Sequence, residues 1–145
     1  MENRPTVLVA TAELDMATFI AGVLQKAGCN VILVSDGLQA FQLINKYPPD
    51  LLIIDLMLPN TDVLKFCRCV RKKTRSPILL TGSSKILGKD VVKALGLTED
   101  EILTKPFSAD ELISRVQVLL KIGVKHEVGV IKSGPLRIDL ERRSV

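Results

Sequence analysis

The chain has 145 residues, which is enough for one domain of ordinary size and little more. Apolar residues make up 47% of it and charged residues 25%, a balance that excludes a disordered tail or a collagen-like rod. A net charge of +4 is not enough by itself to predict a nucleic-acid surface, and the absence of tryptophan argues against an aromatic stacking platform for single strands. Three cysteines and one histidine predict neither a disulfide framework nor a zinc site. The first residues do not resemble a signal peptide, so we expect a cytoplasmic protein.

Five short apolar runs, each followed by a segment with helical spacing, make up most of the first 121 residues. The runs that predict strands are residues 7–10, 31–34, 51–54, 77–80 and 102–103. The apolar residues that recur every three or four positions and predict helices are Ala17, Ile20 and Leu24; Ala40, Leu43 and Ile44; Val63, Phe66, Cys67 and Val70; Leu87, Val91 and Leu95; and Leu112, Val116 and Leu119. Strand–helix alternation predicts an α/β fold with a doubly wound, five-stranded parallel sheet.

Polar residues follow these strands at the edge where doubly wound sheets bind their ligands. In chain order they are Thr11, Ala12 and Glu13, then Asp55, Thr81 and Lys105. A carboxylate, a hydroxyl and an ammonium group would converge there. That set suits a phosphoryl group on Asp55, with Lys105 as a point charge and Thr81 as a hydrogen-bond donor. The alternative is that Asp55 and Lys105 form a structural ion pair and no more.

Two motifs resemble the response-regulator receiver domain, a CheY-like fold, over about residues 5–121. They are Leu-Leu-Ile-Ile-Asp-Leu-Met-Leu-Pro around Asp55 and Leu-Thr-Lys-Pro-Phe around Lys105. The resemblance implies the strand order 2-1-3-4-5 and an aspartate that accepts phosphate from a histidine kinase. The Lys105 motif is similar to the OmpR/PhoB branch, and the tail from Gly134 resembles the start of that branch's winged-helix DNA-binding domain. We therefore expect a receiver domain at 1–121, then a linker and the start of a truncated winged-helix domain at 122–145.

The chain departs from the family at the metal site. The family has two acidic residues after the first strand that hold Mg²⁺, and here Thr11 and Ala12 stand in their place. Mg²⁺ needs oxygen ligands, mostly carboxylates, and phosphoryl transfer depends on its charge. We therefore expect Thr11 and Ala12 to fill the vacated pocket and expect no bound metal or other cofactor. Glu13 or Asp15 could instead restore a weaker Mg²⁺ site.

Two further positions depart from the family pattern. Ile102 stands where the family has its aromatic switch residue, and isoleucine cannot alternate between two aromatic poses. The spacing between the motifs leaves either Thr81 or Ser83 as the switch hydroxyl.

Charged residues also mark a candidate dimer face. Receivers of the OmpR/PhoB branch form symmetric dimers through the fourth helix, fifth strand and fifth helix. Charges of both signs occur at the matching places of this chain, at Lys89, Lys93, Asp100, Glu101 and Arg115. Two-fold symmetry would repeat each pair across the interface, although such residues are also ordinary surface charges. A basic run at residues 68–75 is typical of a solvated helix end, and docking of a partner is its other interpretation.

These features predict a regulatory receiver domain of an OmpR/PhoB-like transcriptional regulator. We expect it to act through dimerisation or partner binding, independently of Mg²⁺-dependent phosphorylation. The rival is a conventional receiver phosphorylated on Asp55. The expected partners are a second copy, a histidine kinase or other regulatory protein, and DNA through the C-terminal domain. An enzyme on a flavodoxin-like scaffold is disfavoured, because the sequence has no glycine-rich phosphate loop, nucleophile–base pair or flavin-stacking aromatics.

Overall fold

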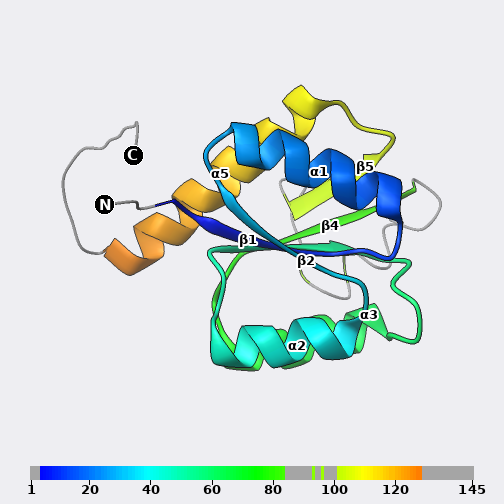
Figure 1. Ribbon diagram of the computed structural model, residues 1–145. Coiled ribbons are helices and arrows are strands. Elements are labelled where there is room, and N and C mark those ends of the chain that lie inside the picture. Colours follow the sequence, from blue (N-terminus) through cyan, green and yellow to red (C-terminus); the bar gives the residue numbers. More distant parts are fainter. Residues whose placement is uncertain (1–3, 84–92, 94–95, 97–100, 129–145) are drawn as a thin grey trace.

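The computed structural model describes residues 4–83, 93, 96 and 101–128, of which 122–128 are described as backbone only. Its strands are β1 (Thr6–Ala10), β2 (Asn30–Val34), β3 (Leu51–Asp55), β4 (Ile78–Ser83) and β5 (Ile102–Lys105). They form one parallel sheet in the order β2-β1-β3-β4-β5 (Figure 1). The predicted fold class and strand order are thereby confirmed.

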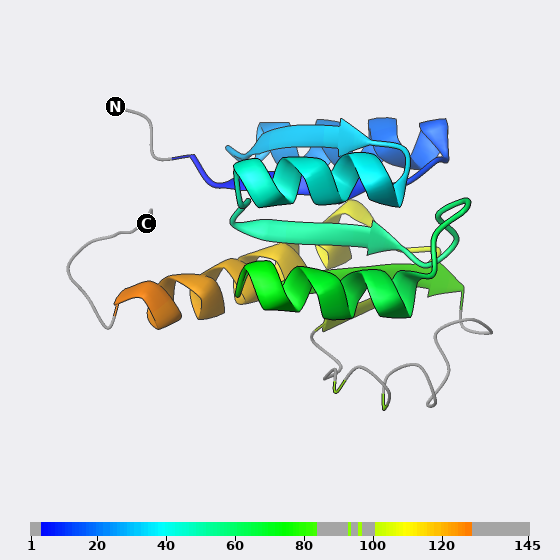
Figure 2. The ribbon, with the colours of Figure 1, turned by 90° about the horizontal axis from the view of Figure 1, so that it is seen from below.

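Among the described residues, helices cover both faces of this sheet (Figure 1). Helices α1 (Leu14–Lys26) and α5 (Ala109–Val128) pack on one face, and α2 (Gly37–Lys46) and α3 (Val63–Lys73) pack side by side on the other (Figure 2). The expected helix around Leu87, Val91 and Leu95 lies outside the described residues. Within the part of the chain that the structure describes, no helix is long and apolar enough to cross a membrane.

Side chains of the strands alternate between two apolar cores. The residues that pack against α1 and α5 include Val7, Val9, Leu51, Ile53, Leu79 and Leu103. The residues between them in the strands point the other way, against α2 and α3, and include Leu8, Ala10, Leu52, Ile54 and Leu80. All five residues of β3 are buried, as a strand in the middle of a sheet covered on both faces requires.

Side chains cap three of the helices, so their first N–H groups do not go unpaired. Asp36 accepts a hydrogen bond from the backbone N–H of Gln39 at 2.8 Å at the start of α2. Before α5 a capping box forms: the N–H of Glu111 donates to Ser108 Oγ at 3.1 Å, and the N–H of Ser108 donates to Glu111 Oε1 at 3.0 Å. A similar cap, at Asp62, begins α3.

Several element boundaries differ from those expected. Strands β3 and β5 include Asp55 and Lys105, which were expected to follow them. Strand β4 continues to Ser83, so Thr81 lies inside the strand rather than after it. Helix α5 continues to Val128, seven residues past Lys121, so the backbone at the start of the expected linker is helical. The alternating apolar residues from Leu136 onward lie outside the described residues, and the domain boundary stays a prediction.

Candidate functional site

The alternation that builds the core also brings the polar residues together at the carboxyl ends of the strands. Val9, Ile53, Leu79 and Leu103 each face α1 and α5, and the residues two positions further along the chain are Thr11, Asp55, Thr81 and Lys105. Because side chains in a strand repeat every two residues, these four fall on the same face of the sheet. Asp55 is in register with Thr81. The sheet places the set where its strand order reverses, the usual ligand position in this architecture.

Asp55 is buried, with 2% of its surface exposed, and both of its carboxylate oxygens have partners. The hydroxyl of Thr11 donates to Oδ2 at 2.9 Å, and Lys105 Nζ lies 3.2 Å from the same oxygen. The backbone N–H of Met57 donates to Oδ1 at 2.9 Å. A buried carboxylate can accept several hydrogen bonds, and these three donors compensate its loss of water. Asp55 and Lys105 form an ion pair, a contact that fits both the phosphoryl-site prediction and the alternative of a structural ion pair.

Thr11, at the position where the family has a metal-binding acid, is buried against Asp55. It is 5% exposed, and its hydroxyl also accepts a hydrogen bond from the N–H of Glu13 at 3.2 Å. Ala12 is exposed, so the expectation that both small residues fill the vacated metal pocket fits Thr11 but not Ala12. The Thr11–Asp55 hydrogen bond was not foreseen from the sequence, although the two-residue repeat from Val9 and Ile53 predicts that the side chains share a face.

Glu13 forms a second ion pair with Lys105. Its Oε2 lies 3.3 Å from Lys105 Nζ, and its side chain is 55% exposed. Lys105 therefore bridges a buried carboxylate and an exposed one, and the three ionised groups carry a formal charge of −1 together. Asp15 is exposed in the first turn of α1. Neither Glu13 nor Asp15 contacts Asp55 in a way that would complete a set of carboxylate ligands.

The residues present do not match the donors that Mg²⁺ prefers. In the described ranges, no group of three or more histidine, cysteine, aspartate or glutamate residues could hold a metal ion. Mg²⁺ requires near-octahedral oxygen coordination and is usually anchored by one or two carboxylates together with waters and phosphate oxygens. At Asp55 one oxygen is already taken by an ammonium and a hydroxyl, both donors.

The two candidates for the switch hydroxyl differ in burial. Thr81 is 1% exposed, and its carbonyl accepts a hydrogen bond from the N–H of Leu56 at 2.9 Å. Ser83 is half-buried and in register with Lys105. Both fall on the site's face of β4, so both remain candidates. Ile102, at the aromatic-switch position, is half-buried and on the other face of β5 from Lys105.

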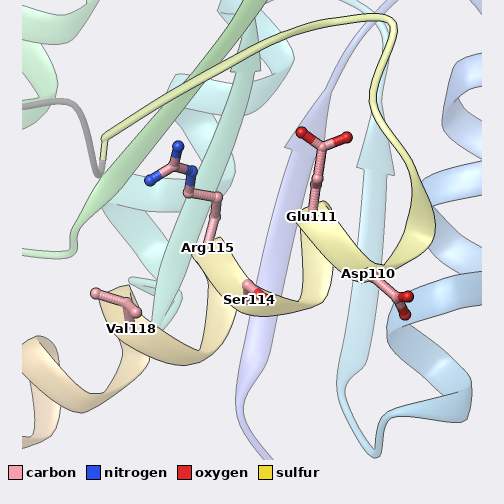
Figure 3. Close-up of a pocket in the computed structure, with 5 residues that line it drawn as sticks. All are labelled: Asp110, Glu111, Ser114, Arg115 and Val118. Atoms are coloured by element: carbon pink, nitrogen blue, oxygen red, sulfur yellow. The ribbon is translucent and has the colours of Figure 1, made fainter.

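The expected dimer face is described only in part. Lys89 and Asp100 lie outside the described residues, Lys93 is exposed, and Glu101 and Arg115 are half-buried. Glu111 and Arg115 project from the same side of α5, one turn apart (Figure 3). Together with neighbours they line a hollow of about 280 Å³, formed by Asp110, Glu111, Ser114, Arg115 and Val118.

The buried cysteines do not contribute a nucleophile to the site. Burial raises the pKa of the Cys29 thiol to about 11, and the charge of Asp50 raises it as well. Burial likewise raises the pKa of Cys67 to about 11, against the smaller opposing effect of Arg71. Cys67 lies on the buried side of α3 and packs in the core, as its place on the apolar stripe predicts.

A doubly wound sheet in the order 2-1-3-4-5, with a buried aspartate and a lysine meeting at its carboxyl edge, defines the class of CheY-like receiver domains. The model of the response regulator receiver domain family matches residues 7–117, and the chain belongs to this family. It is thus a receiver domain of the two-component signalling type.

Curated relatives include regulators of greater length. The chain is 33% identical over 144 residues to the sensory transduction protein RegX3 of Mycobacterium tuberculosis, a match covering 97% of this chain and 63% of RegX3. It is 33% identical over 120 residues to the transcriptional regulatory protein BaeR of Escherichia coli, covering 83% of this chain and 50% of BaeR. The chain therefore spans less than two thirds of the length of these relatives.

Solved structures of receiver domains are also similar. The receiver domain of the Francisella response regulator 1452 matches with a TM-score of 0.72 and 33% identity, covering 82% of this chain and 98% of that one. The chemotaxis response regulator CheY4 of Vibrio cholerae matches with a TM-score of 0.72 and 26% identity, covering 81% and 99%.

Proposed function

We propose that this chain is the receiver domain of an OmpR/PhoB-type transcriptional regulator and that it regulates without Mg²⁺-dependent phosphorylation of Asp55. The observation that carries the proposal is the hydrogen bond from Thr11 to Asp55 Oδ2. In the place where the family has a metal-binding acid, this chain has a donor that binds the phosphoacceptor-position carboxylate directly.

Electrostatics favours this proposal over conventional chemistry. A phosphoryl group on Asp55 would add negative charge beside the Glu13 carboxylate, with Lys105 as the cation that contacts both. Phosphoryl transfer depends on a metal ion to offset such charge. Without carboxylates in place of Thr11 and Ala12, that compensation is missing.

In the proposed mode the domain is a regulatory module rather than an enzyme, and its state is set by association. The relatives RegX3 and BaeR, named for sensory transduction and transcriptional regulation, support placement in a regulator. Glu111 and Arg115 beside the hollow on α5 offer a charged surface for a second copy or a regulatory partner. Association through this surface would set the spacing of attached DNA-binding domains, which is how we propose that the protein acts on DNA.

The test is treatment of the chain with a small phosphodonor and Mg²⁺, followed by intact-mass measurement. We expect the mass to stay unchanged, while a conventional receiver treated in the same buffer gains one phosphoryl group. The Asp55→Asn variant is the matched control for modification at other residues. A stoichiometric phosphoryl adduct on the wild-type chain that is lost in Asp55→Asn contradicts the proposal.

A conventional phosphoacceptor is the second candidate, favoured by the burial of Asp55, its contact with Lys105 and its register with Thr81. It requires Glu13, Asp15 or water to complete a weaker metal site. Titration with Mg²⁺, followed by the NMR shift of the Met57 amide, separates the two. A saturable shift at millimolar Mg²⁺ supports this candidate, and a response no larger than that to an equal ionic strength of KCl dismisses it.

A further inference from the structure

Six exposed cations lie on α3 and just after it. They are Lys65, Arg68, Arg71, Lys72, Lys73 and Arg75. No acidic residue occurs between Asp62 and Asp90. The chain has 20 lysines and arginines against 16 acids, so without these six the remainder has 14 against 16. The positive net charge of the protein is thus concentrated in this one segment, which we call the α3 basic surface.

The helix geometry turns these charges outward. Val63, Phe66, Cys67 and Val70 form the buried stripe of α3. With 3.6 residues per turn, Lys65, Arg68 and Lys72 fall on the opposite side of the helix. The helical part of this segment, residues 65–73, spans about 12 Å at 1.5 Å per residue. None of the six cations forms an ion pair with a residue that the structure describes.

The α3 basic surface continues onto the loop that follows α2. Arg71 donates to the carbonyl of Ser76 at 2.8 Å, and the hydroxyl of Ser76 donates to the carbonyl of Pro49. These bonds hold the end of α3 against the end of α2, where Lys46 is exposed and Tyr47 is 68% exposed. The two helices lie side by side, so their ends form one edge of the molecule (Figure 2).

The α3 basic surface begins with Lys65 in the first turn of the helix and extends to its last turn, Arg71 to Lys73, at the opposite edge of the sheet from Asp55. Each helix of a right-handed strand–helix–strand unit runs back against the strand direction. Asp55 ends β3 at the carboxyl edge, while the last turn of α3 lies beside the amino ends of the strands. Its charge is therefore available whatever happens at Asp55, and this inference does not rest on the proposed function.

We propose that the α3 basic surface binds the phosphate backbone of duplex DNA without regard to sequence. Clustered cations that neutralise phosphates supply affinity of this kind. An acidic protein partner fits less well, because protein interfaces depend on buried aromatic or aliphatic anchors. Among the described residues, the largely exposed apolar side chains lie on elements other than α3. The α3 basic surface therefore offers positive charge but few exposed apolar side chains that could anchor a protein partner.

The experiment measures binding of this chain to a fluorescent random-sequence duplex by anisotropy, between about 50 and 200 mM salt. Three or four phosphate contacts predict a slope of about −3 to −3.5 in log K against log salt. The variant Arg68→Gln/Lys72→Gln removes two outward charges, and we expect its slope to be shallower by about 2. Its affinity at the lowest salt is expected to fall about tenfold or more. Circular dichroism confirms that the variant is folded.

The matched control is Lys26→Gln/Lys121→Gln, which removes the same charge from exposed positions on α1 and α5. We expect the control to lose at most half as much salt slope and half as much affinity as Arg68→Gln/Lys72→Gln loses. Equal losses in both variants, or no binding by the wild-type chain at the lowest salt, overturn the proposal. The proposal is also overturned if polyglutamate displaces the labelled duplex as well as unlabelled DNA does at equal charge. That result would identify the surface as one for acidic proteins.

Discussion

Replacing Thr11 with valine removes one hydroxyl and little else, because the two side chains have nearly the same shape. In the folded protein this hydroxyl donates to the buried Asp55 carboxylate at 2.9 Å and accepts from the Glu13 N–H at 3.2 Å. The variant leaves Asp55 Oδ2 with Lys105 as its remaining partner among the described residues. Its free energy of unfolding is therefore expected to fall.

The size of the effect follows from the charge and burial of the acceptor. A hydrogen bond to a charged group contributes about 1.5 to 3 kcal/mol, against about 1 kcal/mol for a neutral pair. Asp55 is 2% exposed, so water cannot readily replace the lost donor. We expect Thr11→Val to lower the unfolding free energy by roughly 2 kcal/mol at neutral pH. Urea denaturation measures this, with Thr18→Val, at an exposed position of α1, as the control expected to change by less than about 0.5 kcal/mol.

A double-mutant cycle assigns the loss to the pair rather than to the cavity. Thr11→Val, Asp55→Ala and the double variant give a coupling free energy, which we expect to be above about 1 kcal/mol for residues in direct contact. A coupling near zero, or a loss in Thr11→Val no larger than in Thr18→Val, would refute the reasoning. The Thr11 hydroxyl would then donate its hydrogen bond to water rather than to Asp55.

Two further predictions concern other parts of the fold. A methyl group at Gly37 would lie 2.6 Å from Thr61 Cγ2. We therefore expect Gly37→Ala to lower the unfolding free energy by about 1 to 3 kcal/mol and Thr61→Ala to relieve this clash in the double variant. An increase in stability on Gly37→Ala, measured by urea denaturation, would contradict this. The pKa of about 11 for Cys29 and Cys67 predicts slow alkylation at pH 8, at rates that increase about tenfold per pH unit, and half-buried Cys69 is expected to react first. Because unfolded thiols ionise near 9, the two buried thiols should also lower the unfolding free energy as pH rises from 9 to 11. Equal rates for all three cysteines by peptide mapping contradict the burial argument.

The elements of this fold could be predicted where local chemistry decides them. The continuous apolar run before Asp55 indicates a strand covered on both faces, and every residue of β3 is buried. The Ser108 and Glu111 pair predicts the start of α5 because both hydrogen bonds form within four residues. The ends of the elements were harder to predict. Strand β4 continues to Ser83 because it pairs with β5, and such pairing between residues far apart in the sequence cannot be seen in the local pattern.

The candidate site could be predicted by residue but not by contact. The motifs around Asp55 and Lys105 identified both residues, and their ion pair is present. The sequence shows only that Thr11 is a small polar residue at a position where the family has an acidic one. Its hydrogen bond to Asp55 depends on the register of β1 against β3, which the sequence of either strand does not contain. The bridge from Lys105 to Glu13 joins residues 92 positions apart and depends on the same tertiary packing.

The most direct test of the central claim is the unfolding free energy of the wild-type chain with and without Mg²⁺ at matched ionic strength. A folded-state site with a Kd of about 1 mM would stabilise the protein by about 1.4 kcal/mol at about 10 mM Mg²⁺. Because Thr11 and Ala12 supply no carboxylate, we predict a change below about 0.3 kcal/mol, and a measurable gain in Thr11→Asp/Ala12→Asp. A gain of 1 kcal/mol or more in the wild-type chain, abolished by Asp55→Asn, would contradict the claim that this site has lost its metal.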